Sequence, residues 1–193
     1  MSCARGRASS RRAVLGVALC GVGGLLIPRI ARATTFRGLT LRELTQYSEL
    51  ILVATPVAAS SHWMELGGRR RIVTDTRVRV EDVVAKGAPS DGELVVRTLG
   101  GTVGERAALV FGEAALFLNQ TSVLFMLQDA GVCRVTGMAQ GHYPLRADAN
   151  QVLRLMQSPR APELVGEGEP AMRVLPGQEL GQARASIQAA LGR

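Results

Sequence analysis

Side chains alternate in character along residues 71–81, and this pattern constrains the fold more than any other feature of the sequence. A period of two places successive side chains on opposite faces of an extended strand. The pattern predicts a long strand with one face in a core and one mostly charged face. The two faces consist, in turn, of Ile72, Thr74, Thr76, Val78 and Val80, and of Arg71, Val73, Asp75, Arg77, Arg79 and Glu81.

Turn signals on both sides of this strand predict that it has neighbours. Gly67-Gly68 precedes it and predicts a turn from a strand that carries His62 and Trp63. Lys86-Gly87-Ala88-Pro89-Ser90-Asp91-Gly92 follows it and consists of turn-forming residues. Short strands at this close spacing indicate a small barrel or sandwich. Further strands are expected at residues 50–57, 93–99, 114–118, 123–127, 132–136 and 142–145.

Two helices are expected at the ends of this β-rich region. Thr40 and Glu43 form a capping box, which predicts a short helix after Thr40. A second helix is expected over 179–191, where apolar residues follow one stripe. The predicted fold is therefore mainly β, a small barrel or sandwich with a short N-terminal and a C-terminal helix. The predicted organisation is a signal at 1–33, a β-barrel domain at 34–157, and a Pro/Gly-rich linker with the C-terminal helix at 158–193.

The first 33 residues have the pattern of an export signal. Ser10-Arg11-Arg12-Ala13-Val14-Leu15-Gly16 resembles the twin-arginine motif, in which a serine, two arginines and a leucine recur. The apolar stretch 13–27 contains four glycines and ends at Pro28, so it is too short and too weakly apolar to span a bilayer comfortably. Small residues then predict cleavage between Ala33 and Thr34. The alternative is a retained N-terminal anchor.

The signal also accounts for the basic character of the chain. The whole sequence has 23 basic and 16 acidic residues, a formal net charge of +7. Six of the basic residues and none of the acidic ones lie in residues 1–33, so the remainder carries +1. No general positive field remains to attract phosphates, and we therefore expect no nucleic-acid partner. The expected partners during export are the twin-arginine machinery and signal peptidase, with no stable membrane span after cleavage.

Residues 48–145 carry a set of short motifs that are individually weak. They are Trp63, Thr76-Arg77-Val78-Arg79-Val80, Lys86-Gly87, Gly100-Gly101, Gly112-Glu113 and Val135-Thr136-Gly137-Met138-Ala139-Gln140-Gly141-His142-Tyr143. In this order they resemble a group of uncharacterised exported bacterial proteins. The resemblance implies a compact, OB-like β-barrel in the periplasm or outside the cell. It implies no particular activity.

Residues that could carry catalysis are few and scattered. After cleavage Cys133 is the only cysteine, and it lies in an apolar strand, as a buried core residue does. His62, His142 and Cys133 lie in no shared short motif, so we expect neither a metal site nor a cofactor. Residues 100–106 are rich in glycine but lack the pattern of a nucleotide-binding loop. An enzyme is therefore less favoured than a binding domain, and the alternative is a small exported hydrolase that uses His62 or His142.

The surface offers the other functional candidate. Arg71, Arg77 and Arg79 share one strand face, and Trp63 comes from the segment before the Gly67-Gly68 turn. Tryptophan and arginine are enriched at interface hot spots. We therefore predict a binding surface formed by Trp63, Arg77 and Arg79, against the alternative of a solvated face balanced by acids. The expected function is a non-catalytic cell-envelope domain that binds a partner, or else a companion of another exported protein.

Overall fold

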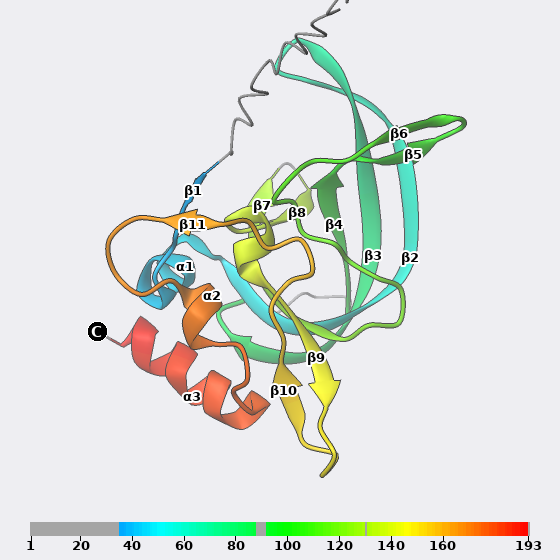
Figure 1. The fold of residues 1–193 in the computed structure, drawn as a ribbon. Helices are drawn as coiled ribbons and strands as arrows, with labels where there is room; N and C mark the ends of the chain where they lie inside the picture. The colour runs from blue at the N-terminus through cyan, green and yellow to red at the C-terminus, as the bar shows by residue number, and fades with distance from the viewer. Residues whose placement is uncertain (1–34, 88–91, 130, 193) are drawn as a thin grey trace, which may run out of the picture. The chain divides into compact units, whose positions relative to one another are not determined.

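The computed structural model describes residues 35–87, 92–129 and 131–192. The predicted signal with Arg11, Arg12, Ala33 and Thr34 lies outside the described residues. The described part of the chain is mainly β with helices near both of its ends, as the sequence predicts (Figure 1). Its elements are β1 (Phe36–Arg37), α1 (Leu41–Tyr47), β2 (Leu50–Leu66), β3 (Arg69–Ala85), β4 (Glu93–Leu99), β5 (Gly101–Val103), β6 (Arg106–Ala108), β7 (Ser122–Asp129), β8 (Val132–Val135), the 3-10 helix η1 (Met138–Gly141), β9 (His142–Ala147), β10 (Leu153–Leu155), β11 (Leu164–Val165), α2 (Ala171–Val174) and α3 (Leu180–Leu191).

The long antiparallel hairpin of β2 and β3 organises the sheet. Each strand has 17 residues, and Gly67 and Gly68 join them with φ angles of 58° and 70°. A two-residue turn with both φ angles positive matches the twist of the flanking strands, and glycine adopts it without steric cost. The predicted strand 71–81 lies within β3, and its even positions face the interior: Ile72, Thr76 and Val78 are buried.

Five strands pair in a closed ring in the order β7, β2, β3, β4, β8 and back to β7. All of these pairings are antiparallel except that of β4 with β8, which is parallel at Val96 and Cys133. Register shifts in the pairing of β2 with β3 mark irregularities of the kind that bend strands. The ring encloses a core that includes Val78, Val96, Leu124, Met126 and Cys133.

A second core lies on the other side of β2 and β7. Ile51 and Phe125 face this side, so the first part of β2, residues 50–56, is buried on both faces, as its unbroken apolar run predicts. The helices cover it, and α1 starts at the predicted capping box, in which the Thr40 hydroxyl accepts from the Glu43 backbone N–H at 3.2 Å. Figure 1 shows α1, α2 and α3 grouped together, with one end of α3 near β10.

Residues 158–193, predicted as a linker and a helix, contribute to this second core. The helix is present as α3, within one residue of its predicted start. Ala171, Met172, Leu175, Ala183 and Ile187 are buried in the same cluster as residues of β2 and β7. The short strand β11 also pairs with β1. The Pro- and Gly-rich composition of this stretch therefore does not prevent it from packing against the rest of the domain.

One predicted strand is wrong. Residues 114–118 form no strand, because their backbone runs as an irregular segment between β6 and β7. Gly100-Gly101 instead leads into a small hairpin formed by β5 and β6. Alternation of residue type does not reveal this hairpin, because its strands have only three residues each.

Candidate functional site

Trp63 does not lie beside Arg77 and Arg79, and that part of the sequence prediction is wrong. Trp63 is directly opposite Ile72 in the hairpin, and opposite residues of an antiparallel pair share a face. Trp63 therefore belongs to the face of the even positions of β3, whereas both arginines occupy odd positions. Arg77 instead forms an ion pair with Glu93 at 3.5 Å, and Arg79 forms one with Glu81 at 2.8 Å. These two pairs fit the alternative of a balanced, solvated face.

Trp63 lies instead in a cleft near the tip of the β2–β3 hairpin. The guanidinium carbon of Arg70 is 5.1 Å from the centre of the indole, a cation–π contact. The cleft has a volume of about 520 Å³ and is bordered on its other side by the β5–β6 hairpin. We call it the Trp63 cleft. Its lining residues are Trp63, Arg70, Arg71, Ile72, Leu99, Glu105, Arg106, Ala107, Ala108 and Val110.

Gly101 explains how the β5–β6 hairpin comes so close to β2 and β3. A Cβ atom at Gly101 would lie 2.2 Å from the Thr74 hydroxyl and 2.4 Å from the Ser61 hydroxyl, and its φ is 127°. The two hydroxyls bond to each other at 2.8 Å, and Thr74 also donates to the Gly100 carbonyl at 2.7 Å. Only glycine fits this approach, which positions Arg106 at the cleft.

The Trp63 cleft has an excess of positive charge. Three arginines face one acid, Glu105, among its lining residues. The ion pairs of the described part of the chain include none made by Arg70, Arg71 or Arg106. Ile72, Leu99 and Val110 supply apolar surface beside these guanidinium groups. The cleft can therefore receive an anionic group next to an apolar one.

The opposite face of the hairpin carries His62 in a different setting. Arg97 holds both carboxylate oxygens of Asp75, at 2.6 Å each, and this hydrogen bonding lowers the pKa of Asp75. His62 is 4.0 Å from the same carboxylate. Ser60 shares this face, but the described hydrogen bonds include none from Ser60 to His62. Because Asp75 is already bound to Arg97, it does not orient His62 as a catalytic base.

His142, the other hydrolase candidate, is buried. Its Nδ1 lies 3.0 Å from the Ser158 hydroxyl and its Nε2 lies 3.2 Å from the Ser122 hydroxyl. Burial lowers the pKa of His142 to about 4. The imidazole has a relative exposure of 1%, so no substrate reaches it in this structure. The arrangement is typical of a core histidine whose ring nitrogens are both satisfied.

Cys133 and the possible metal ligands also offer no reactive site among the described residues. The thiol is buried inside the strand ring, and this burial raises its pKa. Across residues 35–87, 92–129 and 131–192 no three His, Cys, Asp or Glu side chains form a group that could hold a metal ion. Neither observation offers a reactive centre within that part of the chain.

Glu113 is a buried carboxylate that the sequence analysis mentions only as part of a Gly-Glu motif. Its two oxygens accept from the backbone N–H groups of Leu99 and Ala114, at 3.0 Å each. Burial is the main effect on this group and raises its pKa. Glu113 also lines a second cleft of about 260 Å³, together with Arg97 and Arg134. Since both oxygens bind backbone, its clearest role is to fasten the segment after β6 to the end of β4.

The sequence does contain the signal that locates the neighbours of Trp63. A two-residue turn at Gly67-Gly68 fixes the register, so that Glu65 lies opposite Arg70 and Trp63 opposite Ile72. Trp63 and Arg70 are therefore diagonal neighbours on one face. Arg106 has no comparable signal, because its position depends on how the β5–β6 hairpin packs against β2 and β3.

Comparisons with protein-family models, with curated proteins and with solved structures found no match to this chain. Within the described residues, no helix has the length and apolar character needed to cross a membrane.

Proposed function

We propose that this chain is an exported, non-catalytic domain of the cell envelope that binds an acidic segment of a partner protein in the Trp63 cleft. The observation that carries the proposal is the Arg70 guanidinium on the face of Trp63, beside Arg71 and Arg106 and without an acidic partner. The twin-arginine pattern at Arg11 and Arg12 supports the export part. A companion of another exported protein would use the same cleft.

Arginine chemistry points to carboxylates as the recognised groups. A guanidinium group binds a carboxylate through two parallel hydrogen bonds. The contact with Trp63 restrains Arg70 before a ligand arrives, which reduces the entropy lost on binding. The apolar part of the cleft, which includes Ile72 and Val110, accommodates an aliphatic side chain. The favoured ligand is a peptide in which glutamate or aspartate residues flank a leucine-like residue.

The same lining disfavours two other classes of ligand. A saccharide needs several acceptors as well as donors for its hydroxyl groups, and Glu105 is the one side-chain acceptor among the lining residues. Single-stranded nucleic acid needs open aromatic faces for its bases to stack on. One face of Trp63, the only tryptophan, is already covered by Arg70.

The order of the strands also supports the Trp63 cleft as the binding site. We interpret the closed ring of five strands as an OB-like barrel in which β2, β3, β4, β7 and β8 are the successive strands. OB-folds bind ligands on the face of their second and third strands and at the loop between the first and second. The Trp63 cleft lies at the corresponding place, beside the turn between β2 and β3.

The tryptophan makes the proposal directly testable. Because the chain has a single tryptophan, its fluorescence reports on this cleft alone. The protein starting at Thr34 is titrated with a short peptide of alternating glutamate and leucine, and with the same peptide carrying glutamine in place of glutamate. We expect saturable binding of the acidic peptide that weakens as salt is added.

Two variants separate recognition from folding. Arg70→Gln together with Arg106→Gln should weaken binding by about ten-fold or more, because each removes a charge-assisted hydrogen bond. Arg173→Gln, an exposed arginine of α2, is the matched control and should bind normally. Equal binding of both peptides, or an acidic peptide that the double variant still binds normally, would refute acidic-segment recognition. Thermal midpoints of all variants establish that the fold is intact.

A further inference from the structure

Large apolar side chains are exposed along the segment between β6 and β7. Of the ten large hydrophobic residues that are exposed among the described residues, four belong to residues 109–118. Exposed apolar clusters of this kind mark sites of protein or membrane contact. We call this set the apolar segment; its members are Leu109 at 75% exposure, Phe111 at 61%, Phe117 at 50% and Leu118 at 52%.

The backbone of the apolar segment is held so that Ala114, Ala115 and Leu116 pack toward the core while the four exposed side chains face outward. Ala114 and Ala115 are buried, at exposures of 3% and 6%. The Gly112 carbonyl accepts from Ala139 N–H at 2.9 Å, and the Asn119 N–H donates to the Pro56 carbonyl at 2.9 Å. These two backbone hydrogen bonds, one at Gly112 and one at Asn119, fix the segment with its four large side chains exposed.

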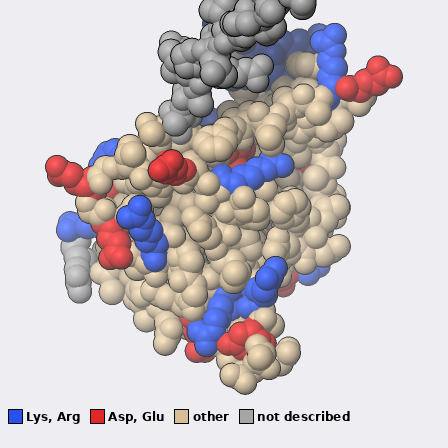
Figure 2. Space-filling view, in the orientation of Figure 1, with Lys and Arg blue, Asp and Glu red and all other residues tan. Residues whose placement is uncertain are grey.

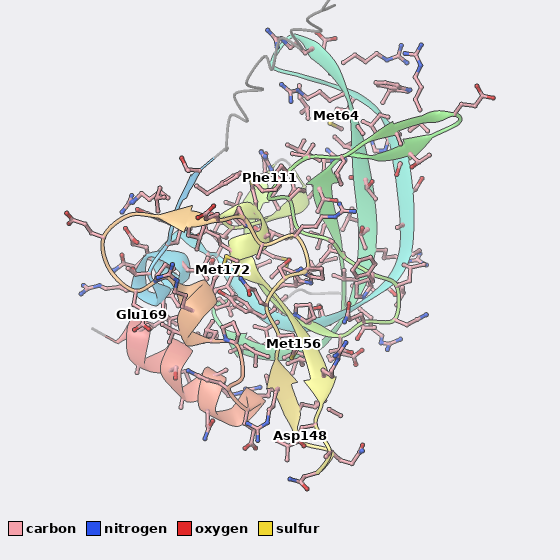
Figure 3. The ribbon with its side chains drawn as sticks, in the orientation of Figure 1. Met64, Phe111, Asp148, Met156, Glu169 and Met172 are labelled. Atoms are coloured by element: carbon pink, nitrogen blue, oxygen red, sulfur yellow. The ribbon has the colours of Figure 1, made fainter. Side chains whose placement is uncertain are left out.

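Positive charge without acidic partners accompanies these side chains. Leu109, Phe117 and Arg160 line one depression of about 400 Å³. Arg106 lies in β6, just before the apolar segment. Neither Arg106 nor Arg160 makes any of the ion pairs found within the described residues. Figure 2, in the orientation of Figure 1, shows basic side chains set in largely uncharged surface. Figure 3 labels Phe111 near β7 and β8.

We infer that the apolar segment is a contact surface for a phospholipid bilayer that contains anionic lipids. Phenylalanine and leucine side chains partition into the boundary between headgroups and acyl chains, and nearby arginines bind anionic headgroups. The backbone of this segment is irregular, so it cannot enter the hydrocarbon region. The contact is therefore limited to side-chain insertion at the interface, which produces reversible binding.

Chain connectivity supports a bilayer over a protein partner. The Phe36 ring packs against Phe111, with ring centroids 6.1 Å apart. Residues 28–35, which separate the apolar stretch 13–27 from Phe36, span at most about 30 Å. If residues 13–27 engage the membrane during export, Phe111 stays close to it until cleavage. This step alone rests on the proposed export, whereas the exposed side chains and unpaired arginines do not.

Vesicle binding tests the inference without depending on the export route. Residues 34–193 form one compact unit, so the protein starting at Thr34 is used. It is sedimented with vesicles of phosphatidylcholine alone and with vesicles in which about a third of the lipid is phosphatidylglycerol. We expect binding to the anionic vesicles, weaker binding to the neutral ones, and partial release by salt.

Variants assign the contact to the apolar segment. Leu109→Ser together with Phe111→Ser should reduce partitioning by about ten-fold or more. Leu153→Ser is the matched control, because Leu153 is 44% exposed on β10 and should leave binding unchanged. Arg160→Gln should reduce binding to anionic vesicles alone.

Two outcomes would overturn the inference. One is failure of the wild-type protein to bind anionic vesicles. The other is a concentration-dependent dimer in sedimentation velocity that Leu109→Ser dissociates while vesicle binding is unchanged, because the segment would then be an interface between copies of the chain. Arg70→Gln should weaken acidic-peptide binding without changing vesicle binding, so failure of the cleft proposal is distinguishable from failure of this one.

Discussion

Acid should destabilise this protein through one buried side chain, His142. The imidazole lies between two hydroxyls, Ser158 at 3.0 Å and Ser122 at 3.2 Å, and is almost fully buried. A neutral ring satisfies both contacts, since one nitrogen donates and the other accepts. Protonation places a charge in the interior, and burial is the cause that lowers the pKa of His142 from 6.5 to about 4.

The size and sign of the effect follow from the two pKa values. The unfolded chain binds a proton at His142 near 6.5, whereas the folded protein binds it only near 4. Between these values the unfolded state carries more protons, so the free energy of unfolding falls as the pH falls. A difference of about 2.5 pKa units corresponds to about 3 kcal/mol. This stability is fully present above 6.5 and lost by about pH 4.

Urea denaturation of the wild type and of His142→Gln measures this contribution. Glutamine keeps a donor and an acceptor but does not titrate, and subtracting the variant removes the contribution of groups that both proteins share, such as Glu113. We expect His142→Gln to be less stable at about pH 7, and the gap to shrink or reverse by about 3 kcal/mol on acidification to about pH 4. Parallel pH profiles for the two proteins would refute the assignment of a neutral, buried imidazole.

Three further predictions test the signal, the C-terminal packing and the cleft. Replacing Arg11 and Arg12 with lysine should leave the precursor in the cytoplasm on cell fractionation; normal processing would contradict the twin-arginine route. Ile187→Ala should lower the free energy of unfolding by about 2–5 kcal/mol, because Ile187 is fully buried, whereas Gln188→Ala on the exposed side of α3 should change it little. Gly101→Ala should lower the thermal midpoint and weaken peptide binding, since the added carbon overlaps two hydroxyls; unchanged values would show that the β5–β6 hairpin does not shape the cleft.

The Trp63 cleft and the apolar segment are neighbours along the chain. Ala107, Ala108 and Val110 line the cleft, and Leu109, which lies between them in sequence, belongs to the apolar segment. A domain on the membrane surface would therefore present its cleft close to the headgroups. Its partner's acidic segment would then be recognised at that surface. The peptide and vesicle assays measure the two events independently.

The sequence alone determined the local structure of this protein. The period of two placed Ile72, Thr76 and Val78 inside, and the capping box at Thr40 started α1, because both depend on residues close together in the chain. The Gly67-Gly68 turn also fixed the register of the hairpin. That register places Trp63 opposite Ile72, on the other face of the hairpin from Arg77.

Only the tertiary structure decided which residues from distant parts of the chain contact these elements. Arg106 reaches the Trp63 cleft because Gly101 lets a three-residue hairpin approach β2 and β3, and Ile187 joins the second core although a Pro- and Gly-rich stretch precedes it. Phe111 and Leu109 would be assigned to a core by composition, yet packing places the small Ala114 inward and leaves them outside. Local patterns record which side chains are apolar, but which of them find a partner depends on contacts between residues far apart in the chain.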